Sequence, residues 1–100
     1  DISDVPYGTP RQYMLYDAHP NPFNPQTRIA YDLPKQTAVN LHIFDLSGRL
    51  VRTLVDGEIV AASRNESVWN GRDDAGRRVA TGVYFYRLTA GDLSTPLLVA

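Results

Sequence analysis

Pro20-Asn21-Pro22-Phe23-Asn24-Pro25 (residues 20–25, the proline strap) constrains the fold of this chain more than any other stretch. Proline fixes φ and has no backbone N–H to donate, so neither a helix nor a central strand can pass through the strap. The asparagines before Pro22 and Pro25 are pushed toward extended conformations. We therefore expect a stiff segment that crosses from one sheet to another and inserts the ring of Phe23 into a neighbouring core.

Length and composition predict a single globular domain. The chain has 100 residues, of which 43% are hydrophobic and 10% aromatic, and a chain of this size builds one core. Its formal net charge of -1 gives no electrostatic basis for binding nucleic acid or an anionic membrane. Cysteine is absent, which excludes disulfides, thiolate catalysis and cysteine-ligated zinc. No signal peptide is recognisable, so we expect an intracellular protein or a mature or excised piece of a longer one.

Short segments of alternating hydrophobicity predict antiparallel strands. In residues 27–33, for example, apolar side chains at 29, 31 and 33 alternate with Arg28, Ala30 and Asp32, which are expected to face solvent. The expected strands cover residues 13–16, 27–33, 39–44, 49–55, 67–69, 83–89 and 93–99. Turn signals between them indicate an all-β antiparallel sandwich of about seven strands. The expected core residues are Ile29, Tyr31, Val39, Leu41, Ile43, Trp69 and at least one of Tyr84 and Tyr86.

Three segments have weaker patterns. In residues 49–55, apolar side chains occupy both faces, so either Leu50 and Leu54 or Val51 and Val55 point inward. Asp56-Gly57 is expected to end that strand. Residues 58–65 are only weakly patterned. Residues 1–12 hold two prolines and a glycine without periodicity, and predict a linker or flexible leader before a module that covers residues 13–100.

Polar turns separate the strands. Asp45-Leu46-Ser47-Gly48 predicts a short hairpin turn, with Asp45 capping and Gly48 in the left-handed conformation. Residues 70–78 predict a longer turn. Gly71 and Gly76 in this turn, and Gly82 after it, suit turn geometry. They do not suit a phosphate-binding loop, because a strand and not a helix follows them.

Few residues suggest chemistry. Asp73 and Asp74, with Asn70, could help hold calcium, but the spacing lacks the ligand alternation of an EF-hand, so turn capping is favoured. His19 and His42 have no suggested carboxylate or serine partner, and there is no nucleophile-elbow pattern. We therefore predict no catalytic, cofactor-binding or metal-binding residues, and no cofactor.

The last long strand carries aromatic residues on both faces. Tyr84 and Tyr86 share one face, and Phe85 lies on the other. Either a neighbouring loop covers Phe85, or an exposed Phe85 marks a contact with carbohydrate or protein.

Several motifs follow one another in order along the chain. They are Asn21-Pro22-Phe23-Asn24-Pro25 with Thr27-x-Ile29-x-Tyr31-x-Leu33-Pro34, Val39-x-Leu41-x-Ile43-Phe44-Asp45 with Gly48-Arg49, Trp69-Asn70-Gly71-Arg72-Asp73, Gly76-Arg77 and Gly82-Val83-Tyr84-Phe85-Tyr86-Arg87-Leu88. With this series, residues 13–100 resemble the FlgD-type immunoglobulin-like domain family, which overlaps with the C-terminal sorting domains of type IX (Por) secretion. The resemblance implies an immunoglobulin-like sandwich. It assigns a structural role to Asn21, Pro22, Phe23, Asn24, Pro25, Asp45, Gly48, Trp69, Gly71, Gly76, Gly82 and Tyr84.

The resemblance also implies a function. It indicates a non-catalytic C-terminal module of a larger exported bacterial protein, secreted or at the cell surface, that acts in type IX sorting or surface attachment. Its partners would be the outer-membrane secretion machinery or neighbouring domains, without nucleic acid or direct membrane insertion. The alternative is a structural accessory domain of a secreted enzyme that contacts carbohydrate or protein. One departure is that such cargo usually has lysine or arginine in its last residues, whereas this sequence ends Thr95-Pro96-Leu97-Leu98-Val99-Ala100. Either this tail is not the native one, or the module is a relative that no longer signals export.

If Phe23 is buried, Phe23→Ala is expected to lower the free energy of unfolding by about 3–5 kcal/mol, because a buried ring contributes that much to a packed core. Urea unfolding of the two proteins measures the difference. A loss below about 1 kcal/mol would show that the ring lies on the surface.

Overall fold

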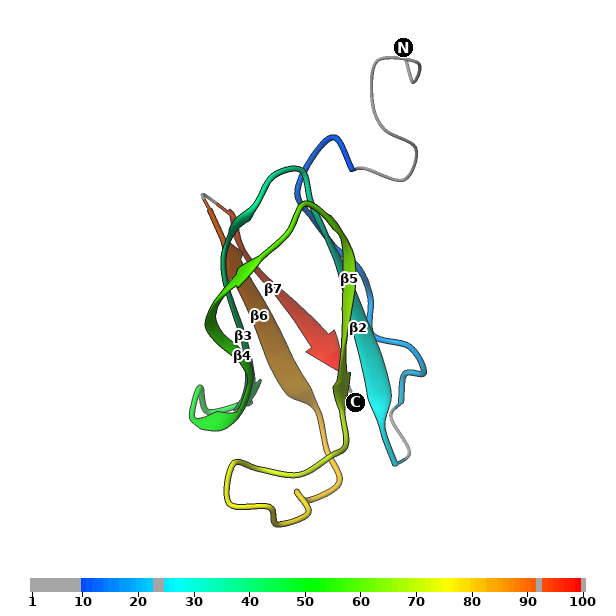
Figure 1. Ribbon diagram of the computed structural model, residues 1–100. Helices are drawn as coiled ribbons and strands as arrows, with labels where there is room; N and C mark the ends of the chain where they lie inside the picture. The colour runs from blue at the N-terminus through cyan, green and yellow to red at the C-terminus, as the bar shows by residue number, and fades with distance from the viewer. Residues whose placement is uncertain (1–9, 23–24, 92, 100) are drawn as a thin grey trace.

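The computed structural model describes residues 10–22 and 25–91 in full and residues 93–99 as backbone. Seven β-strands make up the regular structure of these residues (Figure 1). No helix in this part of the chain is long and apolar enough to cross a bilayer. The strands are β1 (Met14–Leu15), β2 (Thr27–Leu33), β3 (Thr37–Asp45), β4 (Leu50–Val60), β5 (Ser63–Trp69), β6 (Tyr84–Ala90) and β7 (Leu93–Val99). Six strands have at least seven residues, and β1 has two.

The strands form two antiparallel sheets. One has the order β1-β2-β5 and the other β4-β3-β6-β7. In immunoglobulin nomenclature these are strands A-B-E and C′-C-F-G. Pairing of β2 with β5 runs without interruption from Thr27 opposite Trp69 to Leu33 opposite Ser63. The predicted immunoglobulin-like antiparallel sandwich is confirmed.

The core lies between the sheets and follows the alternation of the sequence. Every second residue of β2, β3 and β6 is buried, because side chains alternate between the two faces of a strand. The buried apolar residues of these strands and β5 are Ile29, Tyr31, Leu33, Val39, Leu41, Ile43, Trp69, Tyr84, Tyr86, Leu88 and Ala90. All the predicted core residues are buried, including both Tyr84 and Tyr86.

Strand β4 differs from the prediction. Three register shifts against β3 leave Val51, Leu54 and Gly57 as extra residues without a partner in the ladder. Each such bulge reverses the alternation of side chains. Val51 and Val55 both contact the core, as one of the two expected alternatives has them, but Leu54 contacts it as well, while Leu50 is 48% exposed. Asp56-Gly57 does not end the strand, because Gly57 adopts a φ of 67° at a bulge and pairing continues to Val60.

The position of the proline strap also differs from the prediction. His19 and Arg28 flank it and pair with each other, His19 N donating to Arg28 O at 2.9 Å and Arg28 N to His19 O at 2.8 Å. Because β1 pairs with β2 as well, the strap connects two segments of the same sheet and does not cross to the other. Phe23 and Asn24 lie outside the described residues, so the insertion of Phe23 into the core stays a prediction.

Asp32 was expected to face solvent, but it is only 6% exposed. It lies on the outer face of the smaller sheet, where Arg64 covers it. Arg64 Nε donates to Asp32 Oδ1 at 2.8 Å, and the hydroxyl of Tyr16 donates to Asp32 Oδ2. The guanidinium also lies over the Tyr16 ring, 4.4 Å from its centroid. The hydrogen bond from Arg64 is the main cause that lowers the pKa of Asp32.

Two tyrosines of β6 organise the core with their hydroxyl groups. Tyr84, at the start of β6, donates to Ala80 O at 2.5 Å, which is the tyrosine corner of immunoglobulin-like folds. Its ring packs edge-on against Trp69, with 5.4 Å between the ring centroids. Tyr86 donates to Tyr16 O at 2.9 Å and accepts from Ala18 N at 2.7 Å. Tyr86 therefore joins the larger sheet to the segment that follows β1 of the smaller one.

The buried hydroxyl group of Tyr86 predicts a loss of stability in alkali. Burial is the main cause that raises the pKa of Tyr86 to about 12, from 10.0. A raised pKa favours the folded state below about pH 10, and this contribution disappears as the pH rises through about 12. Two pKa units correspond to at most about 2.7 kcal/mol. We expect the free energy of unfolding, measured with urea, to fall between about pH 9 and about pH 12.

The control is Tyr86→Phe, which keeps the ring but cannot ionise. Its stability should be lower at neutral pH, because Ala18 N and Tyr16 O lose their partner. Its decline in alkali should be shallower. Some decline should remain, since burial also raises the pKa of Tyr31 and Tyr84. If the free energy of unfolding fell equally steeply with pH in both proteins, the loss of stability in alkali would not come from Tyr86.

Candidate functional site: the loop end and the outer face of the larger sheet

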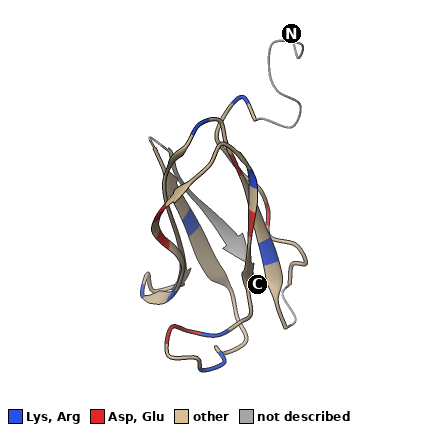
Figure 2. Ribbon diagram, viewed as in Figure 1, with Lys and Arg blue, Asp and Glu red and all other residues tan. Residues whose placement is uncertain are grey.

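The β3–β4 turn and the connection from β5 to β6 lie at the same end of the sandwich (Figure 1). Figure 2 shows basic residues in both loops and acidic residues in the second. Between the loops is a cavity of about 600 Å³, whose lining includes Asp45, Arg49, Leu50, Asp73, Arg77 and Tyr84. Most of the predicted motif residues after the proline strap belong to this loop end.

The β3–β4 turn is closed by Asp45. Its Oδ1 accepts hydrogen bonds from Ser47 N at 2.9 Å and Arg49 N at 3.0 Å, and its carbonyl accepts from Gly48 N at 2.9 Å. Gly48 has a φ of 88°, the left-handed conformation predicted for it. Arg49 Nε lies 3.3 Å from Asp45 Oδ2. Hydrogen bonds, first from the Ser47 hydroxyl, hold the pKa of Asp45 below its usual value.

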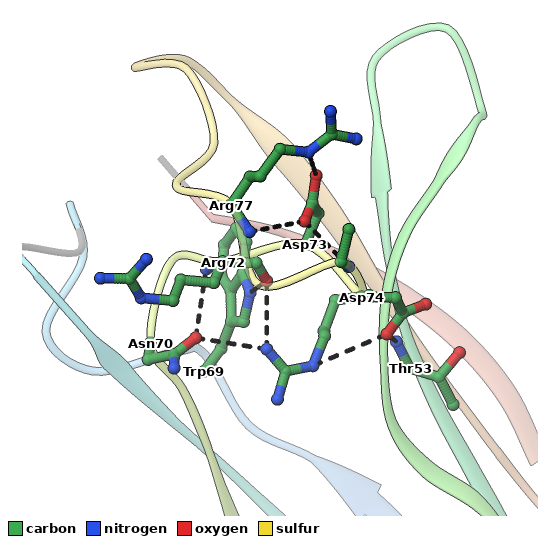
Figure 3. A network of polar contacts seen from close by, with 9 residues as sticks. Thr53, Trp69, Asn70, Arg72, Asp73, Asp74 and Arg77 are labelled. Atoms are coloured by element: carbon green, nitrogen blue, oxygen red, sulfur yellow. Dashed lines mark hydrogen bonds and ion pairs between the residues drawn. The ribbon is translucent and has the colours of Figure 1, made fainter.

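Residues 73–77 repeat this turn. Asp73 Oδ1 accepts from Ala75 N at 3.0 Å and Arg77 N at 2.9 Å, and Gly76, with a φ of 84°, donates to Asp73 O at 2.9 Å (Figure 3). Arg77 Nε lies 3.5 Å from Asp73 Oδ2. The backbone hydrogen bond from Arg77 is the main cause that lowers the pKa of Asp73. The two turns share the sequence Asp-x-x-Gly-Arg, a repeat that was visible in the sequence but was missed.

The three residues considered for calcium point to different partners. Asp73 caps its own turn. Asp74 Oδ1 accepts from Thr53 N at 3.0 Å, and Asp74 N donates to Val51 O at 3.0 Å. Asn70 Oδ1 accepts from Arg72 N at 3.1 Å. Among the described residues, no group of three or more acidic, histidine or cysteine side chains is arranged to hold a metal ion. Asp74 instead attaches the loop to the outer edge of β4.

Arg52 attaches the same loop from β4. Its Nη1 donates to Asn70 Oδ1 at 3.3 Å and to Arg72 O at 3.2 Å, and Trp69 Nε1 donates to the same carbonyl at 3.0 Å (Figure 3). Gly71 has a φ of 75°, so it supplies the turn geometry that was predicted. Gly82 does not, because its φ is not left-handed and an added Cβ would meet no atom within 4 Å. The structure thus ties the buried Trp69 to the loop end.

The two histidines lie apart. His19 is exposed beside the proline strap, where its backbone pairs with Arg28. His42 lies on the outer face of β3, with its ring centroid 6.0 Å from that of Phe44. The structure does not bring them together.

Phe44 and Phe85 form an aromatic pair on the outer face of the larger sheet. They are opposite each other in the β3–β6 register, and both are partly exposed. Phe44, Gly48, Phe85 and Arg87 line a pocket of about 220 Å³. Arg87 Cζ lies 5.8 Å from the centroid of the Phe44 ring. Phe85 is therefore only partly covered, and Phe44 was not recognised from the sequence because its position beside Phe85 depends on strand register.

Comparison with known proteins identifies the family. The sequence model of the FlgD Ig-like domain matches residues 21–94. The chain belongs to the FlgD Ig-like domain family. The matched region of this FlgD Ig-like domain includes both Asp-x-x-Gly-Arg turns and the aromatic pair. The family resemblance noted in the sequence is confirmed.

Two solved structures share the fold. FLGD from P. aeruginosa has a TM-score of 0.59 and 22% identity, and the match covers 73% of this chain and 61% of that chain. Dimeric latent PorU from Porphyromonas gingivalis has a TM-score of 0.65 and 18% identity, covering 89% of this chain and 9% of that chain. The FlgD Ig-like domain therefore spans only part of each of these proteins. No curated protein matches the chain.

The repeated turns predict selective sensitivity to trypsin. Asp73→Ala removes the acceptor that closes the second turn, so the opened loop should be more populated. Cleavage after Arg77 and Arg78 should accelerate several-fold, in proportion to that population. Asp45→Ala is the matched control, and it should accelerate cleavage after Arg49 instead. Mass spectrometry of the fragments over time gives both rates. If Asp45→Ala and Asp73→Ala changed both sites equally, the turns would not be independent.

Proposed function

We propose that this domain performs no reaction and acts as an accessory module of a larger exported bacterial protein, in type IX sorting or cell-surface attachment. The observation that carries the proposal is the match of residues 21–94 to the FlgD Ig-like domain. The likeness to part of PorU is consistent with the same role. We propose residues 13–100 as the module and residues 1–12 as its leader.

The bonding of the charged groups supports a non-catalytic role. At the loop end, the carboxylates of Asp45, Asp73 and Asp74 accept hydrogen bonds from backbone amides. These hydrogen bonds stabilise the loops, and the lowered pKa values of Asp45 and Asp73 oppose a role for these two carboxylates as general acids or bases near neutral pH. His19 pairs with β2 of the smaller sheet and His42 lies on β3 of the larger one, and no ion pair among the described residues joins either to these carboxylates.

The proposed partners are the outer-membrane secretion machinery or neighbouring domains of the parent protein, and the proposed location is secreted or at the cell surface. The formal net charge of -1 offers no attraction to nucleic acid. A second role is favoured by the partly exposed Phe44 and Phe85. It is an accessory interaction domain of a secreted enzyme, which contacts protein or carbohydrate without carrying a sorting signal.

Reporter fusions test the sorting role. Residues 1–100 are fused to the C-terminus of an exported fluorescent reporter, in a bacterium that has the type IX apparatus. Sorting predicts that the reporter reaches the cell surface or the medium, measured by fractionation and protease accessibility. The reporter without the module is the control, and it should stay in the periplasm. A fused reporter that also stays there would contradict sorting by this sequence.

A second fusion carries two lysines added after Ala100, because type IX cargo usually ends in basic residues. If only this fusion crosses the outer membrane, the sandwich is the carrier and the basic tail is the signal. If neither fusion crosses, the accessory interaction role is favoured.

A further inference from the structure

The aromatic pair is the centre of an apolar row that crosses the larger sheet. Phe44 is opposite Leu50 of β4 on one side and Phe85 of β6 on the other, and opposite residues of neighbouring strands share a face. Leu50 is 48% exposed, and both phenylalanines are partly exposed. In β7, Leu98 occupies the register position opposite Phe85. The next row is polar, with His42 opposite Thr53 and Arg87.

The inner faces of these strands already supply the core, so the apolar row on the outer face is not needed to form it. Ile43 and Tyr86 are opposite each other on the inner face and are fully buried. Phe44 and Phe85 point away from them and form the wall of the 220 Å³ pocket with Gly48 and Arg87. A pocket of this size accepts one aliphatic or aromatic side chain. An exposed apolar patch bordered by polar residues is typical of a protein contact.

Arg87 determines the charge of the partner. It is exposed and borders the pocket, and none of the ion pairs found among the described residues includes it. Its guanidinium carbon lies 5.8 Å from the centroid of the Phe44 ring, and the guanidinium is available for a carboxylate, which it binds in a bidentate manner. The patch therefore offers one apolar pocket and one cation side by side.

The guanidinium of Arg87 disfavours two other partners, a second copy of this chain and a neutral sugar. In a symmetric pair of copies, the same patch meets itself, which would place Arg87 near Arg87. A neutral sugar would need several directed hydrogen bonds, but among the described residues that line this pocket only Arg87 has a polar side chain.

We propose that the outer face of β3 and β6 binds an extended acidic peptide segment of another protein. One apolar side chain of the segment enters the pocket between Phe44 and Phe85, and a carboxylate one or two residues away pairs with Arg87. This binding goes beyond the proposed sorting role and does not depend on it, because it concerns the folded face and can be measured without a secretion apparatus.

The test selects peptides from a phage-displayed library of random decamers on the full chain. Peptides that contain an apolar residue with Asp or Glu one or two residues away should be enriched. The most enriched peptide is then synthesised with a fluorescent label, and its affinity is measured by fluorescence anisotropy. Arg87→Glu and Phe85→Thr should each weaken binding by about tenfold or more, as expected for central interface residues. Replacing Glu by Gln in the peptide should weaken binding to the wild-type chain but not to Arg87→Glu.

Arg28→Glu and Val68→Thr are the matched controls, because they introduce the same residues, Glu and Thr, at exposed outward positions of the smaller sheet. They should leave affinity within about twofold. Thermal unfolding checks that all four variants are folded. The proposal is overturned if the selected peptides lack acidic enrichment, or if the two sets of variants weaken binding equally. It is also overturned if no peptide binds, or if cellohexaose binds in a Phe85-dependent way and the peptides do not.

Discussion

The hydroxyl group of Tyr86 sets the position of one sheet relative to the other. It bonds at once to Tyr16 O and Ala18 N, so the chain after β1 cannot slide along β6 without breaking both bonds. In antibody domains, a disulfide between the equivalent of β2 and β6 connects the sheets. This chain has no cysteine, and a buried phenol provides the connection instead. Because an unpaired buried amide or carbonyl is costly, the two bonds also specify one alignment of the sheets. Trp69 and Tyr84, packed edge to face beside them, complete the junction.

Much of the fold could be predicted because three strands obey simple alternation. In β2, β3 and β6 the burial of every second residue follows the sequence, and the predicted core residues of these strands were found from that pattern. Strand β4 could not be predicted in the same way. Its bulges at Val51, Leu54 and Gly57 arise from pairing with β3, and a single strand's sequence contains no information about its partner's spacing. The proline strap was misplaced for a related reason, since a two-residue β1 leaves little pattern to show which sheet it joins.

The loop end also has some features that could be predicted from the sequence and others that could not. The turn at Asp45 was predictable because its capping residue and its left-handed glycine are close in sequence. The contacts that attach the second loop to β4 join residues 18 or more positions apart, such as Arg52 and Asn70 or Thr53 and Asp74. Asp32 was placed in solvent because alternation predicts the face of a residue but not what covers it. Phe85 was correctly expected on the outer face, whereas its neighbour Phe44 could be found only from the β3–β6 register.

Attachment of Asp74 to Val51 and Thr53 has a consequence for the domain's behaviour beside other proteins. Strand β4 is the edge of the larger sheet, and an unpaired edge can recruit strands from other chains. Asp74 occupies part of that edge, and the bulges of β4 make the rest irregular. At the opposite edge, Pro96 of β7 lacks the N–H that a continuous ladder requires. With both of its edges interrupted, the larger sheet is a poor template for strands of other chains, which lowers its tendency to exchange strands or start fibrils where the domain is crowded.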